Sequence, residues 1–213
     1  MHLNSRLLFT RYAKTYFDAR PRVLEIGPDR DPSTYWELAG RPDSEWHTAD
    51  LREAIGEVGQ HRFMEGAPGA FTHAMPSEYD IPVPDNSYDV VLSGQVMEHV
   101  RHIWRWMPEL ARVCRPGGHV ITIAPVSWPY HEVPFDCWRA FPEGMRALSE
   151  DAGLQVVDCR SESLEPPPSR NTYPGLSYAE FAPGAGVRER VKRLIGWPLP
   201  VAVDTITIAR KPG

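Results

Sequence analysis

Apolar segments alternate with helical segments along most of this 213-residue chain, and this alternation constrains the fold more than any other feature. Strands are expected at 22–27, 45–50, 88–94, 119–125, 154–160 and 203–211. Helices are expected at 3–19, 33–40, 95–114 and 142–153, with an interruption at Pro108 and a turn at 115–118. Strands that alternate with helices indicate βαβ units, and therefore an α/β fold whose mostly parallel sheet is covered on both faces.

One domain, residues 1–213, is expected to account for the whole chain. Residues 1–20 are expected to form a helical lid at the amino terminus. Residues 161–200 are rich in proline, glycine and aromatic residues, and we expect an insertion or second lid there, before the last strand. Tyr173, Tyr178 and Phe181 are its candidate contacts to a ligand.

Composition excludes several classes of protein. The net charge of −5 comes without a basic stripe, which argues against a nucleic-acid partner. No apolar run approaches the roughly 20 residues that span a bilayer, and the amino terminus lacks a signal-peptide cleavage pattern. The three cysteines are far apart, so neither a disulfide framework nor a cysteine zinc site is expected. We therefore expect a cytoplasmic protein, either monomer or homodimer, that acts on a small molecule.

The stretch VLEIGPDRDPS, residues 23–33, has the pattern of a buried strand that runs into a nucleotide-binding loop. In an open α/β sheet, ligands bind at the carboxyl ends of the strands, where Glu25 and Gly27 end the first strand. Asp50 ends the second strand, and a carboxylate there can accept hydrogen bonds from both hydroxyls of a ribose. These features alone suit NAD and several other adenosine ligands.

The later glycines of a dinucleotide loop are missing, and Asp29 and Asp31 stand where a pyrophosphate would bind. Two like charges about 4 Å apart repel by several kcal/mol at intermediate dielectric, which disfavours a phosphate. S-adenosylmethionine carries adenosine, a sulfonium and an ammonium but no phosphate, so the same carboxylates favour it. Alternatively, Asp29 and Asp31 face solvent or cap the following helix.

Five motifs in the same order resemble those of the class I S-adenosylmethionine-dependent methyltransferases, over about residues 20–160 and the last strand. "VLEIGP" resembles the first motif of that family, and "HTAD" resembles its ribose-binding acid. "IPVPDNSYDVVLSGQVMEHV", "ELARVCRPGGHVITIAP" and "FPEGMRALSEDAGLQVV" resemble its later segments. The resemblance is to the small-molecule, type 11-like branch of the family. It implies a Rossmann-like sheet of seven strands in the order 3-2-1-4-5-7-6, with strand 7 antiparallel.

The resemblance also implies S-adenosyl-L-methionine as cofactor and S-adenosyl-L-homocysteine as product. Contacts to the cofactor are expected along the carboxyl ends of the first four strands. The expected residues are Glu25, Gly27, Pro28, Asp29, Asp50, Leu51, Ser77, Glu78, Tyr79, Ser93, Gly94, Gln95 and His99.

The acceptor must lose a proton if its nucleophile is a hydroxyl or an ammonium group, so a base is expected near the methyl group. The candidates are His131, Asp136 and His99, because an imidazole titrates near neutral pH and a carboxylate can orient it. Substrate contacts are expected from Tyr12, Tyr16, Trp128, His131, Trp138 and Arg139. Alternatively, Asp136 and Arg139 pair to hold the loop and Trp138 belongs to the core. No metal is expected, because His99 and His102 lack a third ligand in the sequence.

The predicted function is transfer of a methyl group from S-adenosylmethionine to an oxygen of a small metabolite, such as a sugar or natural-product intermediate. Nitrogen and carbon are less favoured acceptors. The alternatives are a protein of this fold that binds the cofactor for non-methyl chemistry or without catalysis, and an NAD-dependent oxidoreductase.

Overall fold

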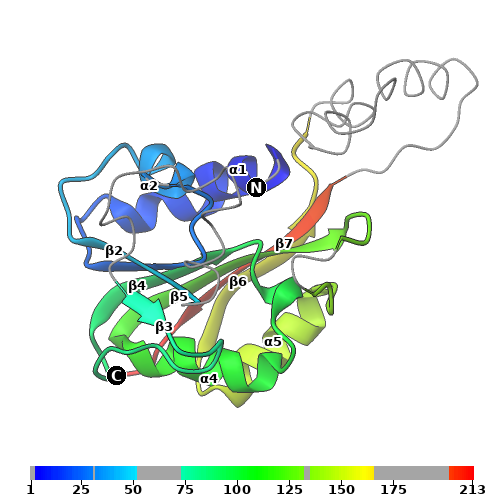
Figure 1. The fold of residues 1–213 in the computed structure, drawn as a ribbon. Helices are drawn as coiled ribbons and strands as arrows, with labels where there is room; N and C mark the ends of the chain where they lie inside the picture. Colours follow the sequence, from blue (N-terminus) through cyan, green and yellow to red (C-terminus); the bar gives the residue numbers. More distant parts are fainter. Residues whose placement is uncertain (1–2, 31, 52–72, 132–134, 166–201) are drawn as a thin grey trace, which may run out of the picture.

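A seven-stranded sheet forms the centre of the molecule (Figure 1). The computed structural model describes residues 3–30, 32–51, 73–131, 135–165 and 202–213. The strands are β1 (Val23–Ile26), β2 (Trp46–Leu51), β3 (His73–Met75), β4 (Tyr88–Gly94), β5 (Cys114–Ser127), β6 (Gln155–Glu162) and β7 (Val203–Arg210). Their order is β3-β2-β1-β4-β5-β7-β6, and only β7 runs antiparallel to its neighbours. The predicted Rossmann-like topology is therefore confirmed.

Two hydrophobic layers cover the sheet because side chains alternate between its faces along each strand. One layer packs β-strand residues such as Leu24 and Val91 against helices α4 (Ile103–Val113) and α5 (Pro142–Asp151). The other packs residues such as Val23 and Leu92 beneath the amino-terminal segment and α2 (Thr34–Leu38). Figure 1 shows α1 and α2 on one side of the sheet and α4 and α5 on the other.

The amino-terminal segment is helical throughout, but it is not one α-helix. It consists of α1 (Leu3–Leu8), a π-helical turn (Phe9–Ala13) and a 3₁₀ turn (Lys14–Phe17). Leu8, Phe9 and Phe17 are buried in the sheet layer. The helix type thus changes twice along a segment whose large side chains pack on one face of the sheet.

Three predictions near α4 and β5 were wrong in detail. Pro108 lies inside α4 and does not interrupt it, because buried Trp106 and Leu110 anchor the helix on both sides of the proline. The helical segment also begins later than predicted, after a 3₁₀ turn at Met97–His99. Residues 115–118 lie within β5 as an irregularity in its pairing with β4, and not as a separate turn before the strand.

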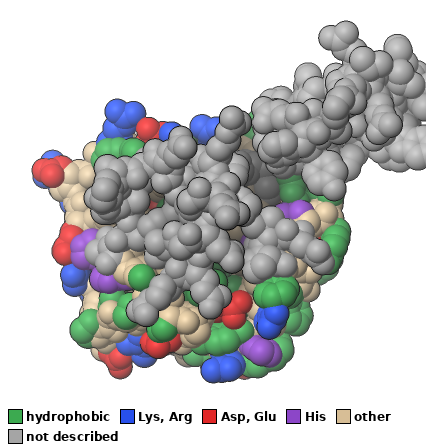
Figure 2. Space-filling view, viewed as in Figure 1, with side chains coloured by type: hydrophobic (Ala, Val, Ile, Leu, Met, Phe, Trp, Pro, Cys, Tyr) green, Lys and Arg blue, Asp and Glu red, His purple; other side chains and the backbone are tan. Residues whose placement is uncertain are grey.

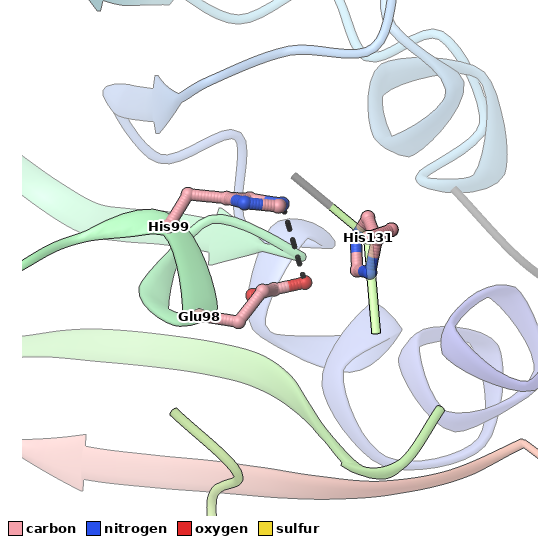
Figure 3. Close-up of side chains that lie close together, drawn as sticks. All are labelled: Glu98, His99 and His131. Carbon is pink, nitrogen blue, oxygen red and sulfur yellow. Dashed lines mark ion pairs between the residues drawn. The ribbon is translucent and has the colours of Figure 1, made fainter. Parts of the chain in front are cut away.

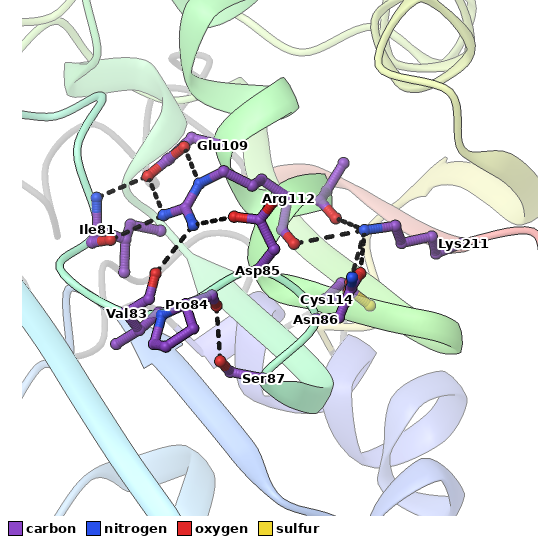
Figure 4. A network of polar contacts seen from close by, with 11 residues as sticks. Ile81, Val83, Pro84, Asp85, Asn86, Ser87, Glu109, Arg112, Cys114 and Lys211 are labelled. Carbon is purple, nitrogen blue, oxygen red and sulfur yellow. Dashed lines mark hydrogen bonds and ion pairs between the residues drawn. The ribbon is translucent and has the colours of Figure 1, made fainter.

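The loop before β4 is held by a polar network, shown in Figure 4. Arg112 of α4 donates to Glu109 and Asp85 and to the carbonyl oxygens of Ile81 and Val83. Lys211, which follows β7, donates to carbonyl oxygens at the end of α4 and at Cys114. The "PDNSYD" motif therefore fixes the start of β4 and lies at the opposite end of that strand from its carboxyl edge.

Acidic and basic side chains are interspersed over the visible described surface in Figure 2, without a continuous basic stripe on that face. Within the described ranges, no helix combines the length and the apolar character that crossing a membrane requires.

Candidate functional site at the carboxyl edge of the sheet

The carboxyl ends of β1, β2, β3 and β4 lie side by side, because these strands are parallel neighbours in register. Gly27 ends β1 with φ of +63°, a left-handed conformation that glycine adopts without strain. Its N–H donates to the carbonyl oxygen of Ala49 at 2.9 Å, which holds the turn against β2. A Cβ at Gly27 would lie 2.5 Å from Cγ2 of Val96, so the loop after β4 closes directly over this turn.

Glu25 is buried beneath this turn with 1% of its surface exposed. Its Oε2 accepts hydrogen bonds from Ser33 Oγ at 2.5 Å and from Trp46 Nε1 at 2.9 Å. Burial raises the pKa of Glu25 to about 7, although both hydrogen bonds act in the opposite direction. Glu25 therefore links β1 to the start of β2 and to the residue that precedes α2. It lies in the central strand of the carboxyl edge where a ligand is expected.

Asp29 caps helix α2. Its carboxylate accepts from the backbone N–H of Thr34 at 3.0 Å and from the Thr34 hydroxyl at 2.7 Å. Arg30 turns toward the same helix, where it donates to Thr34 and pairs with Glu37. The capping alternative therefore describes Asp29, while Asp31 lies outside the described residues. The argument that two loop carboxylates favour a cationic cofactor is therefore weaker, because the Asp29 carboxylate already accepts two hydrogen bonds from Thr34.

Asp50 lies at the carboxyl end of β2, where a ribose-binding acid was expected. Its Oδ1 accepts the N–H of Leu51 at 2.7 Å, and burial raises its pKa to about 6. Ser77 and Tyr79 follow β3, the neighbour of β2, and the Tyr79 N–H lies 3.3 Å from the Ser77 hydroxyl. Tyr79 also contacts His102 through its hydroxyl at 2.9 Å. The predicted ribose-binding acid and the predicted cofactor contacts Ser77 and Tyr79 thus come from adjacent strand ends.

Ser93 and Gly94 end β4, and both are buried. Gln95 follows with φ of +60° and donates its N–H to the carbonyl oxygen of Ile123. The side-chain amide of Gln95 donates to Ser5 at 2.7 Å and to Asp204 at 3.1 Å. This side chain therefore joins the β4 end to α1 and β7, a role that the sequence did not indicate.

Tyr35 is a residue at this edge that the sequence prediction missed. Its ring is 1% exposed, and a Cβ at Gly94 would lie 2.1 Å from its hydroxyl oxygen. That oxygen has no hydrogen-bond partner among the described residues. Burial, followed by the charges of nearby Glu25 and Asp204, raises the pKa of Tyr35 well above its usual range. A buried, unpaired hydroxyl between the ends of β1 and β4 suits a polar ligand at this edge.

Three side chains converge beyond the end of β4, as Figure 3 shows: Glu98, His99 and His131. His99 Nε2 lies 3.8 Å from Glu98 Oε1. The rings of His99 and His131 are arranged edge to face, with their centroids 5.0 Å apart. His99 Nδ1 lies 2.5 Å from the carbonyl oxygen of Phe135. A carbonyl oxygen only accepts, so Nδ1 carries the proton and Nε2 offers a lone pair toward Glu98.

Asp136 holds the loop that carries His131. Arg139 binds its two carboxylate oxygens at 2.5 and 2.8 Å, and the His131 N–H donates to Oδ2 at 2.9 Å. The hydrogen bond from Arg139 is the main cause that lowers the pKa of Asp136 to about 2. Asp136 is therefore a weak proton acceptor, and the loop-holding alternative describes the Asp136–Arg139 pair.

The predicted substrate contacts fall in different parts of the fold. Trp138 donates its indole N–H to the Val100 carbonyl at 2.8 Å and packs on the core, as the alternative for it states. The carbonyl oxygen of Trp128 accepts from Arg139 at 3.1 Å, so that backbone belongs to the same loop. The guanidinium carbon of Arg160 in β6 lies over the Tyr12 ring, 4.5 Å from its centroid.

Tyr16 contacts His119 edge to face at 4.7 Å. His119 pairs with Val90, four residues before the end of β4 at Gly94. At about 3.3 Å per residue this contact is roughly 13 Å from the ligand edge. Tyr16 therefore has no place in the site proposed below. Tyr173, Tyr178 and Phe181 lie outside the described residues.

Comparisons with known proteins agree with this geometry. Residues 44–122 match a family described as a methyltransferase domain. Over 114 residues the chain is 31% identical to a demethylmenaquinone methyltransferase from Symbiobacterium thermophilum, covering 52% of this chain and 45% of that protein. A ubiquinone/menaquinone biosynthesis C-methyltransferase, UbiE, from Burkholderia orbicola is 30% identical over 105 residues, which are 48% of this chain and 42% of the relative. The matches thus span less than half the length of these relatives.

A solved structure shares the fold over nearly the whole chain. It is a phosphoethanolamine N-methyltransferase from Haemonchus contortus, in complex with phosphomonomethylethanolamine and S-adenosylhomocysteine. Its TM-score is 0.60 at 16% identity, covering 99% of this chain and 53% of the other. At this identity the likeness concerns the fold.

Proposed function

We propose that this chain, a class I S-adenosylmethionine-dependent methyltransferase, transfers the cofactor methyl group to an oxygen atom of a small hydroxylated metabolite. The proposal rests on the matched domain family and on the arrangement of the carboxyl edge. The observation that supports it most is that four segments expected to contact the cofactor lie side by side at this edge. Gly27 ends β1, Asp50 ends β2, Ser77 to Tyr79 follow β3, and Ser93 to Gln95 end β4.

The residues present suit this cofactor. Asp50 supplies acceptor oxygens for two ribose hydroxyls, and binding would return hydrogen bonds to a carboxylate that burial disfavours. The left-handed turn at Gly27 brings backbone close to the ligand without a side chain. The Tyr35 hydroxyl, unpaired within the described ranges, supplies a donor between β1 and β4. When bound, the cofactor supplies a methyl group already activated by the sulfonium.

The task left to the protein is alignment and deprotonation of the acceptor. His131 is the best base in this arrangement, since Nδ1 donates to the Pro129 carbonyl at 3.1 Å and leaves Nε2 with a lone pair. His131 Nε2 would accept the proton of the acceptor hydroxyl when the methyl group passes to the oxygen, its bond to the sulfonium breaks and S-adenosylhomocysteine is left as product. Asp136 and Arg139 hold the His131 backbone in place and are positioning residues.

The names of the two curated relatives concern quinone precursors, and one specifies methylation at carbon. A base that ionises a phenolic hydroxyl activates both the oxygen and the neighbouring ring carbons, because the negative charge is delocalised. We therefore propose oxygen as the first acceptor atom and ring carbon as the second. Transfer from ¹³C-methyl-labelled cofactor to a panel of phenols, sugars and amines, read by NMR, identifies the atom from the chemical shift of the methyl carbon.

Calorimetric titration tests the cofactor assignment. The chain is titrated separately with S-adenosylmethionine, S-adenosylhomocysteine and NAD. We expect saturable binding of the first two and none of NAD, since Asp29 and Glu25 border the loop where a pyrophosphate would lie. Binding of NAD alone would overturn the proposal. Binding of S-adenosylmethionine without methyl transfer to any acceptor would favour a cofactor-binding protein with other chemistry.

A further inference from the structure

Glu98, His99 and His131 form a cluster that the proposed function uses only in part. One potential ligand atom from each lies within 4.8 Å of those of the other two. Glu98 comes from the 3₁₀ turn after β4 and is 1% exposed, whereas His131 comes from the loop after β5. Figure 3 shows the three side chains directed toward one point. We infer that this cluster binds a divalent transition-metal ion, with zinc as the best match to its donors.

The two histidine donors are in the tautomer that a metal ion requires. The His99 Nδ1 proton is donated to the Phe135 carbonyl, which fixes the ring and directs the lone pair of Nε2 to the cluster. His131 is held in the same way by the Pro129 carbonyl. Histidine ligands in metal sites characteristically donate their second nitrogen to a carbonyl or carboxylate. Two imidazoles and one carboxylate form a ligand set that zinc and related ions accept.

Glu98 supplies the independent observation that points to a ligand. Its Oε2 is buried and has no hydrogen-bond partner in the part of the chain that the structure describes. A buried carboxylate oxygen without a partner is unfavourable, and a bound cation would satisfy it.

The geometry needs only a small adjustment. Ligand atoms around tetrahedral zinc are separated by roughly 3.3 Å, given bonds of about 2.0–2.1 Å. The His99–Glu98 pair is at 3.8 Å, and the remaining separations reach at most 4.8 Å. The ligand atoms must therefore approach one another by at most about 1.5 Å when an ion binds. Three protein ligands leave a coordination position open, which is the arrangement of catalytic zinc sites.

The consequence for chemistry rests on the proposed function, whereas cation binding does not. A cation in the open cluster would bind the acceptor oxygen and lower the pKa of its hydroxyl, so that the hydroxyl could lose its proton to water without a free imidazole base. Metal binding and proton acceptance by His131 use the same lone pair.

The test is titration of tag-free, chelator-treated protein with Co²⁺, followed by visible absorption and by competition with Zn²⁺. We expect one Co²⁺ per chain with the d–d bands of an ordered site, and displacement by Zn²⁺. Glu98→Gln and His131→Asn should each weaken Co²⁺ affinity by more than the ~10–100-fold that loss of an outer-sphere partner produces. Circular dichroism confirms that each variant is folded, and His131→Asn changes a partly exposed loop residue.

His73→Asn is the matched control, because His73 and His47 form a second histidine pair, with ring centroids 5.4 Å apart, around the Tyr88 hydroxyl. This variant should bind Co²⁺ as the wild type does. Absence of d–d bands in the wild type would overturn the inference, and so would unchanged affinity in both ligand variants. Either result leaves the cofactor titration unaffected, so failure of this inference and failure of the proposed function are distinguishable.

Discussion

At the residue scale, ionisable groups with raised pKa values gather at one edge of the sheet. Burial raises the pKa of Glu25 to about 7, of Asp50 to about 6 and of Asp204 to about 7. Each is an acid whose charged form loses hydration, and local hydrogen bonds compensate only in part. Such clusters are found at functional sites more often than elsewhere, and here they border the proposed cofactor position.

Asp50 gives a prediction about pH. Ribose hydroxyls donate to the carboxylate, so the ligand binds the ionised form of Asp50. Below the pKa of about 6, binding must first expel a proton, and affinity falls by up to tenfold per pH unit. We expect S-adenosylhomocysteine to bind about tenfold more weakly at pH 5 than at pH 8, as measured by calorimetry.

Asp50→Asn is the control for this titration. The variant should bind more weakly at pH 8 and should lose the part of the pH dependence that comes from Asp50. Equal slopes of affinity against pH in wild type and variant would show that another group is responsible. Wild-type affinity in the variant at pH 8 would remove Asp50 from the ribose site.

At the element scale, two glycines have opposite structural roles. Gly94 ends β4 against Tyr35, where an added Cβ would lie 2.1–2.6 Å from three atoms of the ring and hydroxyl. Gly144 is exposed in the first turn of α5, and an added Cβ there meets nothing within 4 Å. The close approach at Gly94 brings Tyr35 to the ligand edge, whereas Gly144 only weakens its helix.

Substitution of these glycines by alanine should therefore have effects of opposite sign. Gly94→Ala should lower the free energy of unfolding by about 1–3 kcal/mol through overpacking. Gly144→Ala should raise it by roughly 0.5–1 kcal/mol, because alanine favours the helix. Urea unfolding followed by circular dichroism measures both. A neutral Gly94→Ala would mean that Tyr35 moves aside easily, contrary to its buried position.

At the scale of the whole molecule, Asn4 joins the amino-terminal segment to β7 and to the edge strand β6. Its amide donates to Asp204 of β7 at 2.7 Å and to the Glu162 carbonyl of β6 at 2.9 Å, and its oxygen accepts the Leu164 N–H at 2.8 Å. Asn4 is fully buried. The segment is therefore bonded into the fold, and its predicted role as a lid over the substrate remains a prediction.

Asn4→Ala should lower the free energy of unfolding by about 1–3 kcal/mol, because it removes the hydrogen bonds that Asn4 makes in a buried position with the Asp204 carboxylate, the Glu162 carbonyl and the Leu164 N–H. Thr10→Ala is the matched control, since the exposed Thr10 hydroxyl donates to the Arg6 carbonyl within its own helical segment. It should change stability by no more than about 0.5 kcal/mol. Equal unfolding midpoints in urea for the two variants would contradict the role assigned to Asn4.

Local patterns in the sequence were enough to predict six of the seven strands and most helix positions, but they missed the short strand β3 (His73–Met75). Apolar runs, helix caps such as Ser33, and turn residues such as Gly27 act over a few neighbouring residues, so they are visible without the fold. Glycine and acid at the ends of β1 and β2 indicated the ligand edge for the same reason. The strand order came from a resemblance to known motifs, and the structure confirms it.

Only the tertiary structure decided which polar side chains meet. Glu98 and His131 are 33 residues apart in the sequence, and Asn4 and Asp204 are separated by 200. No local pattern reveals such contacts, because they depend on how loops after different strands fold over one edge. The sequence therefore predicted an α/β sheet of this topology and a candidate ligand site at its carboxyl edge. The fold decided that Asp29 caps a helix, that Asp136 holds a loop, and that two histidines meet a buried carboxylate.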